Sequence, residues 1–145
     1  MFEIEYHLKN SEGRSFIVYQ DSLGNPTVGW GHHDPNFIVG AQYTLSQIQA
    51  FFYQDLKIAK QDYNKLELQL DSVREGIVTM ILFQLGYPTF VKFKKTIQAL
   101  KDHDFAEAAR QLGVGSSDTV PSMYRTQTTK RVHRYMAGLL TGIYL

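Results

Sequence analysis

Three side chains near the start of the chain could carry out chemistry together: Glu12, Asp21 and Thr27. Cleavage of a glycosidic bond needs two carboxyl groups flanking that bond, one protonated to act as a general acid and one ionised to activate water or stabilise the transition state. The Thr27 hydroxyl could help to hold such a water. Two acids nine residues apart also occur by chance in many soluble chains. From these residues alone, a pair of surface acids therefore remains the alternative.

The adjacent residues His32 and His33 raise the possibility of a metal site. Zinc would need further ligands at a matching spacing, and the sequence contains neither H-x-x-x-H nor H-E-x-x-H. Asp34 follows directly, but neighbouring residues rarely chelate one ion together. There is no cysteine, so disulfides and thiolate-bound metals are excluded. We predict no metal and no other cofactor, and a histidine beside a sheet is more often an ion-pair or hydrogen-bond partner.

Two other chemistries lack their sequence patterns. The glycines at positions 29, 31 and 40 do not form a phosphate-binding loop, because G-x-x-x-x-G-K-[ST] is absent. A hydrolase nucleophile elbow would need G-x-S-x-G, which is also absent. The paired carboxyls therefore remain the strongest candidate for a reactive site.

The elements that must position these carboxyls can be predicted from local patterns. Residues 3–11 predict a short helix that ends at Gly13, which places Glu12 at the helix C-terminus, where the helix dipole disfavours a negative charge. The runs SFIVYQ and TVGW, separated by DSLGNP, predict a β-hairpin with Asp21 at the end of its first strand. The segment HHDPNFIVGAQY predicts a loop or a third short strand.

The rest of the chain is predicted to be helical. Thr44 and Gln47 form a capping box before a helix of about 20 residues, whose apolar positions fall on one stripe. Ser72 and Glu75 predict a second capping box, before the strongly apolar segment VREGIVTMILFQLG. A further helix is expected around 90–100, where one apolar face includes Phe90 and Leu100. Another is expected around 105–112, capped by Asp104 and ended by Gly113. A last helix is expected to start at about 128. The predicted stripe of the last helix is Val132, Met136, Leu139 and Ile143.

This order predicts an α+β fold in which a small antiparallel sheet is joined by a long helix to a mostly helical lobe. The 145 residues fit one domain, and 43% hydrophobic and 20% charged residues are compatible with an ordinary soluble core. We expect the sheet lobe at about 13–58 and the helical lobe at about 1–12 and 64–145.

Charge is unevenly distributed along the chain. Residues 119–145 carry four basic side chains and no acid, whereas residues 1–118 carry 11 basic and 14 acidic side chains. The basic segment could meet a polyanionic cell wall, a membrane surface or nucleic acid, although a solvated helix face explains it as well. The N-terminus does not resemble a secretory signal, and no apolar stretch is long enough to span a membrane. We therefore expect a cytosolic protein.

A longer chain of motifs resembles one family, the phage T4-type lysozymes, which are endolysin muramidases of glycoside hydrolase family 24. The resemblance rests on Glu12-Gly13, Asp21, Thr27 and Gly29-Trp30-Gly31-His32, with the family's spacing. It continues through FFYQDL, VREGIVTMILFQLG, FKKTIQAL, DFAEAARQL and QTTKR, and so covers nearly the whole chain. One departure is the segment between His32 and Thr44, which is shorter than in the family.

The resemblance implies a role for each matching residue. Glu12 would be the general acid, Asp21 would orient and activate the attacking water, and Thr27 would help to hold it. His32 would pair with Asp55 as a structural ion pair. In addition, Arg131 would lie near the general acid, and sugar would be contacted by His33, Phe83, Thr96 and Gln111.

The implied activity is hydrolysis of the β-1,4 bond between N-acetylmuramic acid and N-acetylglucosamine in peptidoglycan, with inversion at the anomeric carbon and lysis of the bacterial host. The resemblance also implies a monomer without nucleic-acid binding or stable membrane insertion. Such a protein would be held in the host cytoplasm until a separate holin gives it access to the wall. Two alternatives remain open: a wall-binding or virion-associated module without strong catalysis, and membrane perturbation by residues 126–145.

Overall fold

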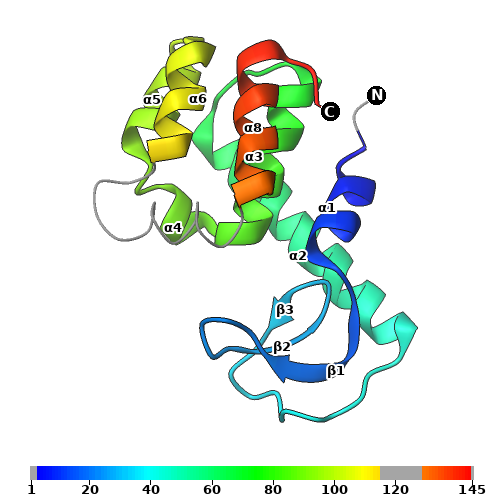
Figure 1. Cartoon of the computed structure of the whole chain (residues 1–145). Helices are drawn as coiled ribbons and strands as arrows, with labels where there is room; N and C mark the ends of the chain where they lie inside the picture. Colours follow the sequence, from blue (N-terminus) through cyan, green and yellow to red (C-terminus); the bar gives the residue numbers. More distant parts are fainter. Residues whose placement is uncertain (1–2, 115–128, 145) are drawn as a thin grey trace.

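The computed structural model describes residues 3–114 and 129–144. A three-stranded sheet lies at one end of the long helix α2, and most of the other helices gather around its other end (Figure 1). The architecture is α+β, which confirms the predicted fold class. The described elements are α1 (Ile4–Glu12), β1 (Ser15–Gln20), β2 (Pro26–Gly29), β3 (His32–His33), α2 (Leu45–Leu66), α3 (Ser72–Leu85), α4 (Tyr87–Phe90), α5 (Lys94–Lys101), α6 (Phe105–Val114) and α8 (Thr129–Thr141).

The predicted hairpin is present, and the segment after it contributes a short third strand. The strands pair antiparallel in the order β1-β2-β3. Thr27 is aligned with Tyr19 on one side and with His33 on the other. This register sets three polar side-chain positions in one row across the sheet.

The long helix α2 begins as predicted, with a complete capping box. Thr44 Oγ1 accepts a hydrogen bond from the Gln47 backbone N–H at 3.2 Å, and Gln47 Oε1 accepts one from the Thr44 N–H at 2.8 Å. The predicted apolar stripe is buried from Ile48 to Tyr63, while Leu45 at its start is 44% exposed. One side of α2 therefore packs into the core along most of its length, and that packing holds the helix between the sheet and the other helices.

Helix α3 is buried nearly all round, with seven consecutive buried residues from Gly76 to Leu82. The predicted capping box at its start is wrong. Ser72 is the first residue of the helix, and Asp71 is the N-cap, accepting the Arg74 N–H at 3.1 Å. Aspartate caps a helix as well as serine does, so the capping pattern in the sequence was displaced by one residue.

Arg74 also ties the start of α3 to the end of the last helix. Its Nε donates to the Leu139 carbonyl at 2.7 Å and its Nη2 to the Leu140 carbonyl at 3.1 Å. Its Nη1 pairs with Asp71 at 2.9 Å, and its guanidinium lies 3.6 Å from the centroid of the Phe105 ring. A cation thus satisfies carbonyls at the C-terminus of α8, where the helix dipole favours positive charge.

Three predictions about the later helices need correction. The apolar face expected around 90–100 is divided between α4 and α5, although Phe90 and Leu100 are both buried. Gly113 does not end α6, which continues to Val114. Ile143 lies beyond the end of α8 and is 61% exposed, whereas Tyr135, which the sequence stripe missed, is buried.

None of the helices in the described part of the chain is both long enough and apolar enough to cross a membrane.

Candidate active site

Glu12 is the last residue of α1 and lies in a mostly enclosed site. The helix ends at Gly13, whose φ of 69° turns the chain toward β1. Arg131, from the start of α8, donates to Glu12 Oε1 at 2.8 Å and to the Ser11 carbonyl at 2.6 Å. The side chains of Arg131 and Glu12 are 14% and 16% exposed. The structure thus brings together two residues that are 119 positions apart in the sequence.

Two opposing effects act on the ionisation of Glu12. Burial raises the pKa of its carboxyl above the ordinary value, because an ionised carboxylate loses hydration. The Arg131 guanidinium opposes this through its charge and its hydrogen bond, but the net shift of the pKa is upward. This direction favours the protonated form that a general acid needs.

Gly31 approaches the same carboxyl from the turn between β2 and β3. Its φ is 79°, and a Cβ added to it would lie 2.9 Å from Glu12 Oε2. A larger residue would therefore press on the carboxyl and strain the backbone. The glycine in the Gly-Trp-Gly-His segment allows the sheet to come this close to Glu12.

Asp21 lies in the turn after β1 and is held mainly by backbone groups. Its Oδ1 accepts the N–H groups of Leu23 at 2.9 Å and Asn25 at 2.8 Å. Burial by itself would raise the pKa of Asp21, but those two backbone hydrogen bonds, the Asn25 side chain and the nearby charge of His33 together hold the pKa below its ordinary value. Asp21 Oδ2 accepts only a long 3.4 Å bond among the described residues, so it can also bind a water.

Thr27 and Tyr19 are paired positions on neighbouring strands, close to the turn that holds Asp21. Thr27 is 2% exposed, and its hydroxyl donates to the Asn25 carbonyl at 2.8 Å, in the same turn that holds Asp21. Burial raises the pKa of Tyr19, and the charges of Glu12 and Asp21 raise it further. Both carboxyls therefore lie within electrostatic range of one side chain, Tyr19, which the sequence did not single out.

The two histidines have different surroundings. His32 Nδ1 lies 2.8 Å from Asp55 Oδ2 of α2, and its ring stacks on Phe51 with centroids 4.4 Å apart. His33 is exposed and faces the pocket described next. Within residues 3–114 and 129–144, no group of three or more His, Asp and Glu side chains could hold a metal ion.

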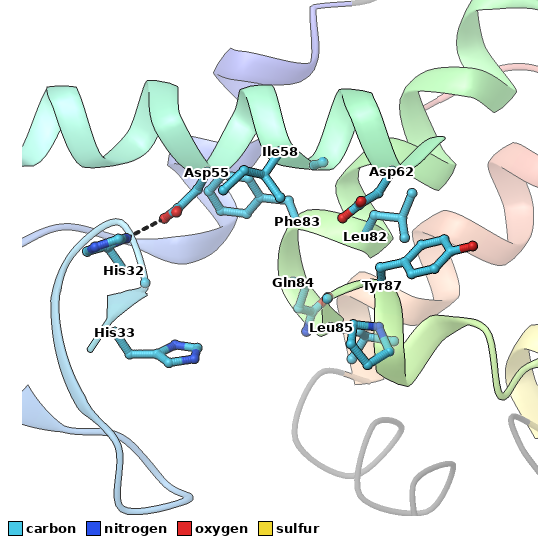
Figure 2. A pocket seen from close by; sticks show the side chains of 14 residues that line it. His32, His33, Asp55, Ile58, Asp62, Leu82, Phe83, Gln84, Leu85 and Tyr87 are labelled. Atoms are coloured by element: carbon cyan, nitrogen blue, oxygen red, sulfur yellow. Dashed lines mark hydrogen bonds and ion pairs between the residues drawn. The ribbon is translucent and has the colours of Figure 1, made fainter. Parts of the chain in front are cut away.

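A pocket of ≈ 330 Å³ lies between the short strand β3, helix α2 and the end of α3. Asp55, Ile58 and Asp62 project from α2 along one wall, with His32 and His33 at one end and residues of α3 and α4 at the other (Figure 2). Gly31 belongs to the lining, so the pocket reaches the glycine whose added Cβ would press on Glu12. Among the described residues, the lining is Gly31, His32, His33, Asp55, Ile58, Ala59, Asp62, Leu82, Phe83, Gln84, Leu85, Gly86, Tyr87 and Pro88.

The four residues expected to contact sugar are not all brought together. His33 and Phe83 line the pocket. Thr96 is 1% exposed on α5, and Gln111 is 8% exposed on α6 with its amide donating to Glu107 at 2.8 Å. Neither belongs to the lining of this pocket, and Gln111 lines a different pocket between α5 and α6, so sugar contact at Thr96 and Gln111 stays a prediction.

Three polar lining residues were not predicted from the sequence. Asp62 is 7% exposed although it is charged, and its Oδ1 pairs with Lys65 at 2.9 Å. Gln84 Oε1 is buried without a hydrogen-bond partner among the described residues. Tyr87 lies beneath Lys65, 4.9 Å from Nζ to the ring centroid. A signal for Asp62 was available, because it follows Asp55 by seven residues and therefore lies on the same face of α2.

Comparison with known protein families places the chain in a class. Residues 9–120 match the model of the phage lysozyme family. The match covers more than half of the chain and includes Glu12, Asp21 and Thr27. The protein belongs to the phage lysozyme family.

Individual relatives agree with this assignment. The chain is 26% identical to "Probable T4-type lysozyme 2" of Dictyostelium discoideum over an alignment of 163 positions that covers 93% of this chain and 92% of that protein. A second Dictyostelium protein, "Probable T4-type lysozyme 1", is 23% identical with the same coverage. The "SAR-endolysin" of Enterobacteria phage P21 is 26% identical over 102 residues, which cover 70% of this chain and 61% of that protein.

Proposed function

We propose that this phage-type lysozyme is a muramidase that hydrolyses the β-1,4 bond between N-acetylmuramic acid and N-acetylglucosamine in bacterial peptidoglycan. The observation that carries the proposal is the opposite tuning of two carboxyls: burial raises the pKa of Glu12, while hydrogen bonds and charge lower that of Asp21. A glycosidase needs one carboxyl of each kind. Glu12 acts as the general acid and Asp21 as the group that activates water.

The reaction proceeds in one displacement. Glu12 gives its proton to the oxygen of the leaving sugar as that bond breaks. Asp21 accepts a proton from a water that attacks the anomeric carbon from the opposite face, so the configuration is inverted. The hydroxyl of Thr27 helps to place this water, and its hydrogen bond to the Asn25 carbonyl fixes it beside the turn that holds Asp21. Arg131 stabilises the carboxylate of Glu12 after the proton has left.

The pocket beside this centre supplies a surface for the glycan. His33 and Phe83 offer a polar ring and an aromatic ring, and Tyr87 extends the aromatic surface at the far end. Aromatic rings pack well against the apolar faces of sugars, and the carboxylate of Asp62 can accept a hydrogen bond from a sugar hydroxyl. These contacts should affect KM more than kcat.

The test compares release of reducing sugar from purified peptidoglycan by wild type, Glu12→Gln and Asp21→Asn. We expect both variants to lose at least about 100-fold in rate, because each removes an acid–base group. Glu67→Gln, on an exposed residue after α2, is the matched control. Sugar release by Glu12→Gln at the wild-type rate would refute the assigned acid. Binding to the wall without any sugar release by wild type would favour the alternative of a non-catalytic wall-binding module.

Access to the substrate is a further part of the proposal. Peptidoglycan lies outside the cytoplasmic membrane, so an endolysin that remains in the host cytoplasm needs a separate holin to reach it. Expression in bacteria with and without a co-expressed pore-forming protein tests this. Lysis only in the presence of the pore supports a cytoplasmic reservoir, whereas lysis without it shows that the chain reaches the wall by another route.

A further inference from the structure

A lysine in helix α1 is enclosed by aromatic rings from two other segments. Lys9 Nζ lies 4.6 Å from the ring centroid of Trp30, 5.0 Å from that of Phe52 and 5.5 Å from that of Tyr53. Glu5, one helical turn earlier, pairs with the same ammonium at 3.1 Å and accepts the Tyr53 hydroxyl at 2.7 Å. One ammonium group therefore contacts α1, the turn after β2 and α2 at the same time.

This contact lies about one helical turn before the proposed catalytic acid on α1. Lys9 precedes Glu12 by three residues on one helix, so the two side chains emerge from neighbouring positions on its surface. Trp30 immediately precedes Gly31, the residue on which an added Cβ would lie 2.9 Å from Glu12 Oε2. The contact of Lys9 with Trp30 thus joins the same two segments that meet at the carboxyl of Glu12.

The chemistry of the pair makes this junction more specific than apolar packing. Trp30 is 7% exposed and Lys9 is one-quarter exposed, so the ammonium meets the indole largely out of water. Cation–π attraction is strongest with tryptophan, grows with desolvation and requires the cation above the ring face. It therefore constrains how the indole is oriented as well as how near it lies.

We propose that Lys9 is a positioning residue for catalysis: its ammonium, held over Trp30, fixes the end of α1 against the β2–β3 turn and so sets the place of Glu12. This inference rests on the proposed role of Glu12 as general acid. Lys9 itself does not touch the substrate or the reacting atoms. Small displacements of a catalytic group cost much in rate and little in substrate binding, so the effect falls on kcat.

The test uses Lys9→Met, which keeps a long apolar side chain and removes the charge. We expect kcat on soluble peptidoglycan fragments to fall about tenfold while KM changes by less than about twofold. Lys9→Arg retains a cation for the indole and should recover kcat to within about threefold of wild type. Trp30 is the one tryptophan of the sequence, so intrinsic fluorescence reports the contact directly. We expect Lys9→Met to change the emission spectrum and Lys9→Arg to leave it nearly unchanged.

Glu5→Gln provides the matched control, because it removes the ion pair and leaves the ammonium over the rings. We expect its kcat to stay within about twofold of wild type. Equal losses in Glu5→Gln and Lys9→Met would overturn the proposal, since the ion pair and not the indole contact would then hold the helix. Wild-type kcat in Lys9→Met, with Glu12→Gln inactive, would also overturn it and leave the proposed function standing. An active Glu12→Gln would instead refute the proposed function.

Thermal unfolding separates displacement from loss of the fold. If Lys9→Met cannot be purified in a folded state, Trp30→Phe replaces it, because phenylalanine keeps a ring with weaker attraction for a cation. We expect Trp30→Phe to lower kcat and leave KM unchanged. Unchanged kcat in a folded Trp30→Phe would overturn the proposal.

Discussion

Replacement of Arg131 by methionine tests the electrostatics of the site most directly. Burial raises the pKa of Glu12, and the charge and hydrogen bond of Arg131 are the effects that lower it. A hydrogen bond to a charged group contributes about 1.5–3 kcal/mol, and one pKa unit corresponds to about 1.4 kcal/mol. Loss of Arg131 should therefore destabilise the ionised form of Glu12 by about 1.5–3 kcal/mol and raise the pKa of Glu12 further.

The sign of the effect on activity follows from the role of the acid. In its proposed role as general acid, Glu12 must be protonated to donate its proton, so a higher pKa should keep the enzyme active at higher pH. The alkaline limb of the kcat/KM profile of Arg131→Met should therefore move to higher pH, because the ionised form of Glu12 loses its hydrogen bond. At the same time the absolute rate should fall, because Arg131 no longer stabilises the carboxylate that remains after proton transfer.

Stability should change with pH in the matching direction. The folded pKa of Glu12 lies above its unfolded value, so its contribution to stability is fully present below the unfolded pKa and is lost as pH rises through the folded pKa. In Arg131→Met this loss should grow by about 1.4 kcal/mol for each unit of added pKa shift. Urea unfolding at several pH values measures it separately from the pH-independent cost of losing the bond to the Ser11 carbonyl.

The assay combines the pH–rate profile with NMR titration of the Glu12 side-chain carbon. Arg131→Lys is the control, since it keeps the charge and loses the forked geometry, and we expect a smaller shift in the same direction. An alkaline limb that stays in place or moves to lower pH in Arg131→Met would refute the reasoning, as would a Glu12 pKa that does not rise.

Three further outcomes are expected. Arg74→Met should lower the free energy of unfolding, measured by urea denaturation, by about 2–4 kcal/mol, because it leaves two carbonyls at the end of α8 without their donor. A change below about 0.5 kcal/mol would contradict this. Gly31→Ala should reduce kcat by about 10–100-fold, because its Cβ would press on Glu12 Oε2, and kinetics at wild-type level would show that the carboxyl can move away. Thr27→Val should lower kcat by at least about tenfold while thermal unfolding shows a cost near 1 kcal/mol, and a kcat close to that of wild type at this stability cost would assign Thr27 a structural role instead.

Much of the fold could be predicted because its signals are local. The capping box of Thr44 and Gln47, the glycine after Glu12 and the turn residues between β1 and β2 act over a few positions, and the structure contains all three features. The wrong prediction of the cap of α3 also concerns a local signal. Asp71 and Ser72 can both cap a helix, so the pattern does not decide between them, and in the structure Asp71 is the N-cap.

The site was harder to predict because its parts come from distant segments. The contact of Arg131 with Glu12 spans 119 residues, and no helical or strand periodicity indicates it. It was expected only through resemblance to a family. Asp62 was missed for a different reason: a charged residue on a long helix is normally exposed, whereas Asp62 is buried beside the pocket that the end of α3 also lines.

The position of Glu12 disfavours an ionised carboxylate, and a general acid needs the protonated form. A carboxylate at the C-terminus of a helix is disfavoured by the helix dipole, and burial disfavours it again. Both effects oppose the ionised form and leave the protonated form almost untouched. Asp21, nine residues later, has the opposite surroundings, because a tight turn directs two backbone N–H groups at its carboxyl. A helix end followed by a hairpin turn therefore separates the pKa values of the Glu12 and Asp21 carboxyls by backbone geometry and burial. Arg131 limits how far the pKa of Glu12 rises above its ordinary value.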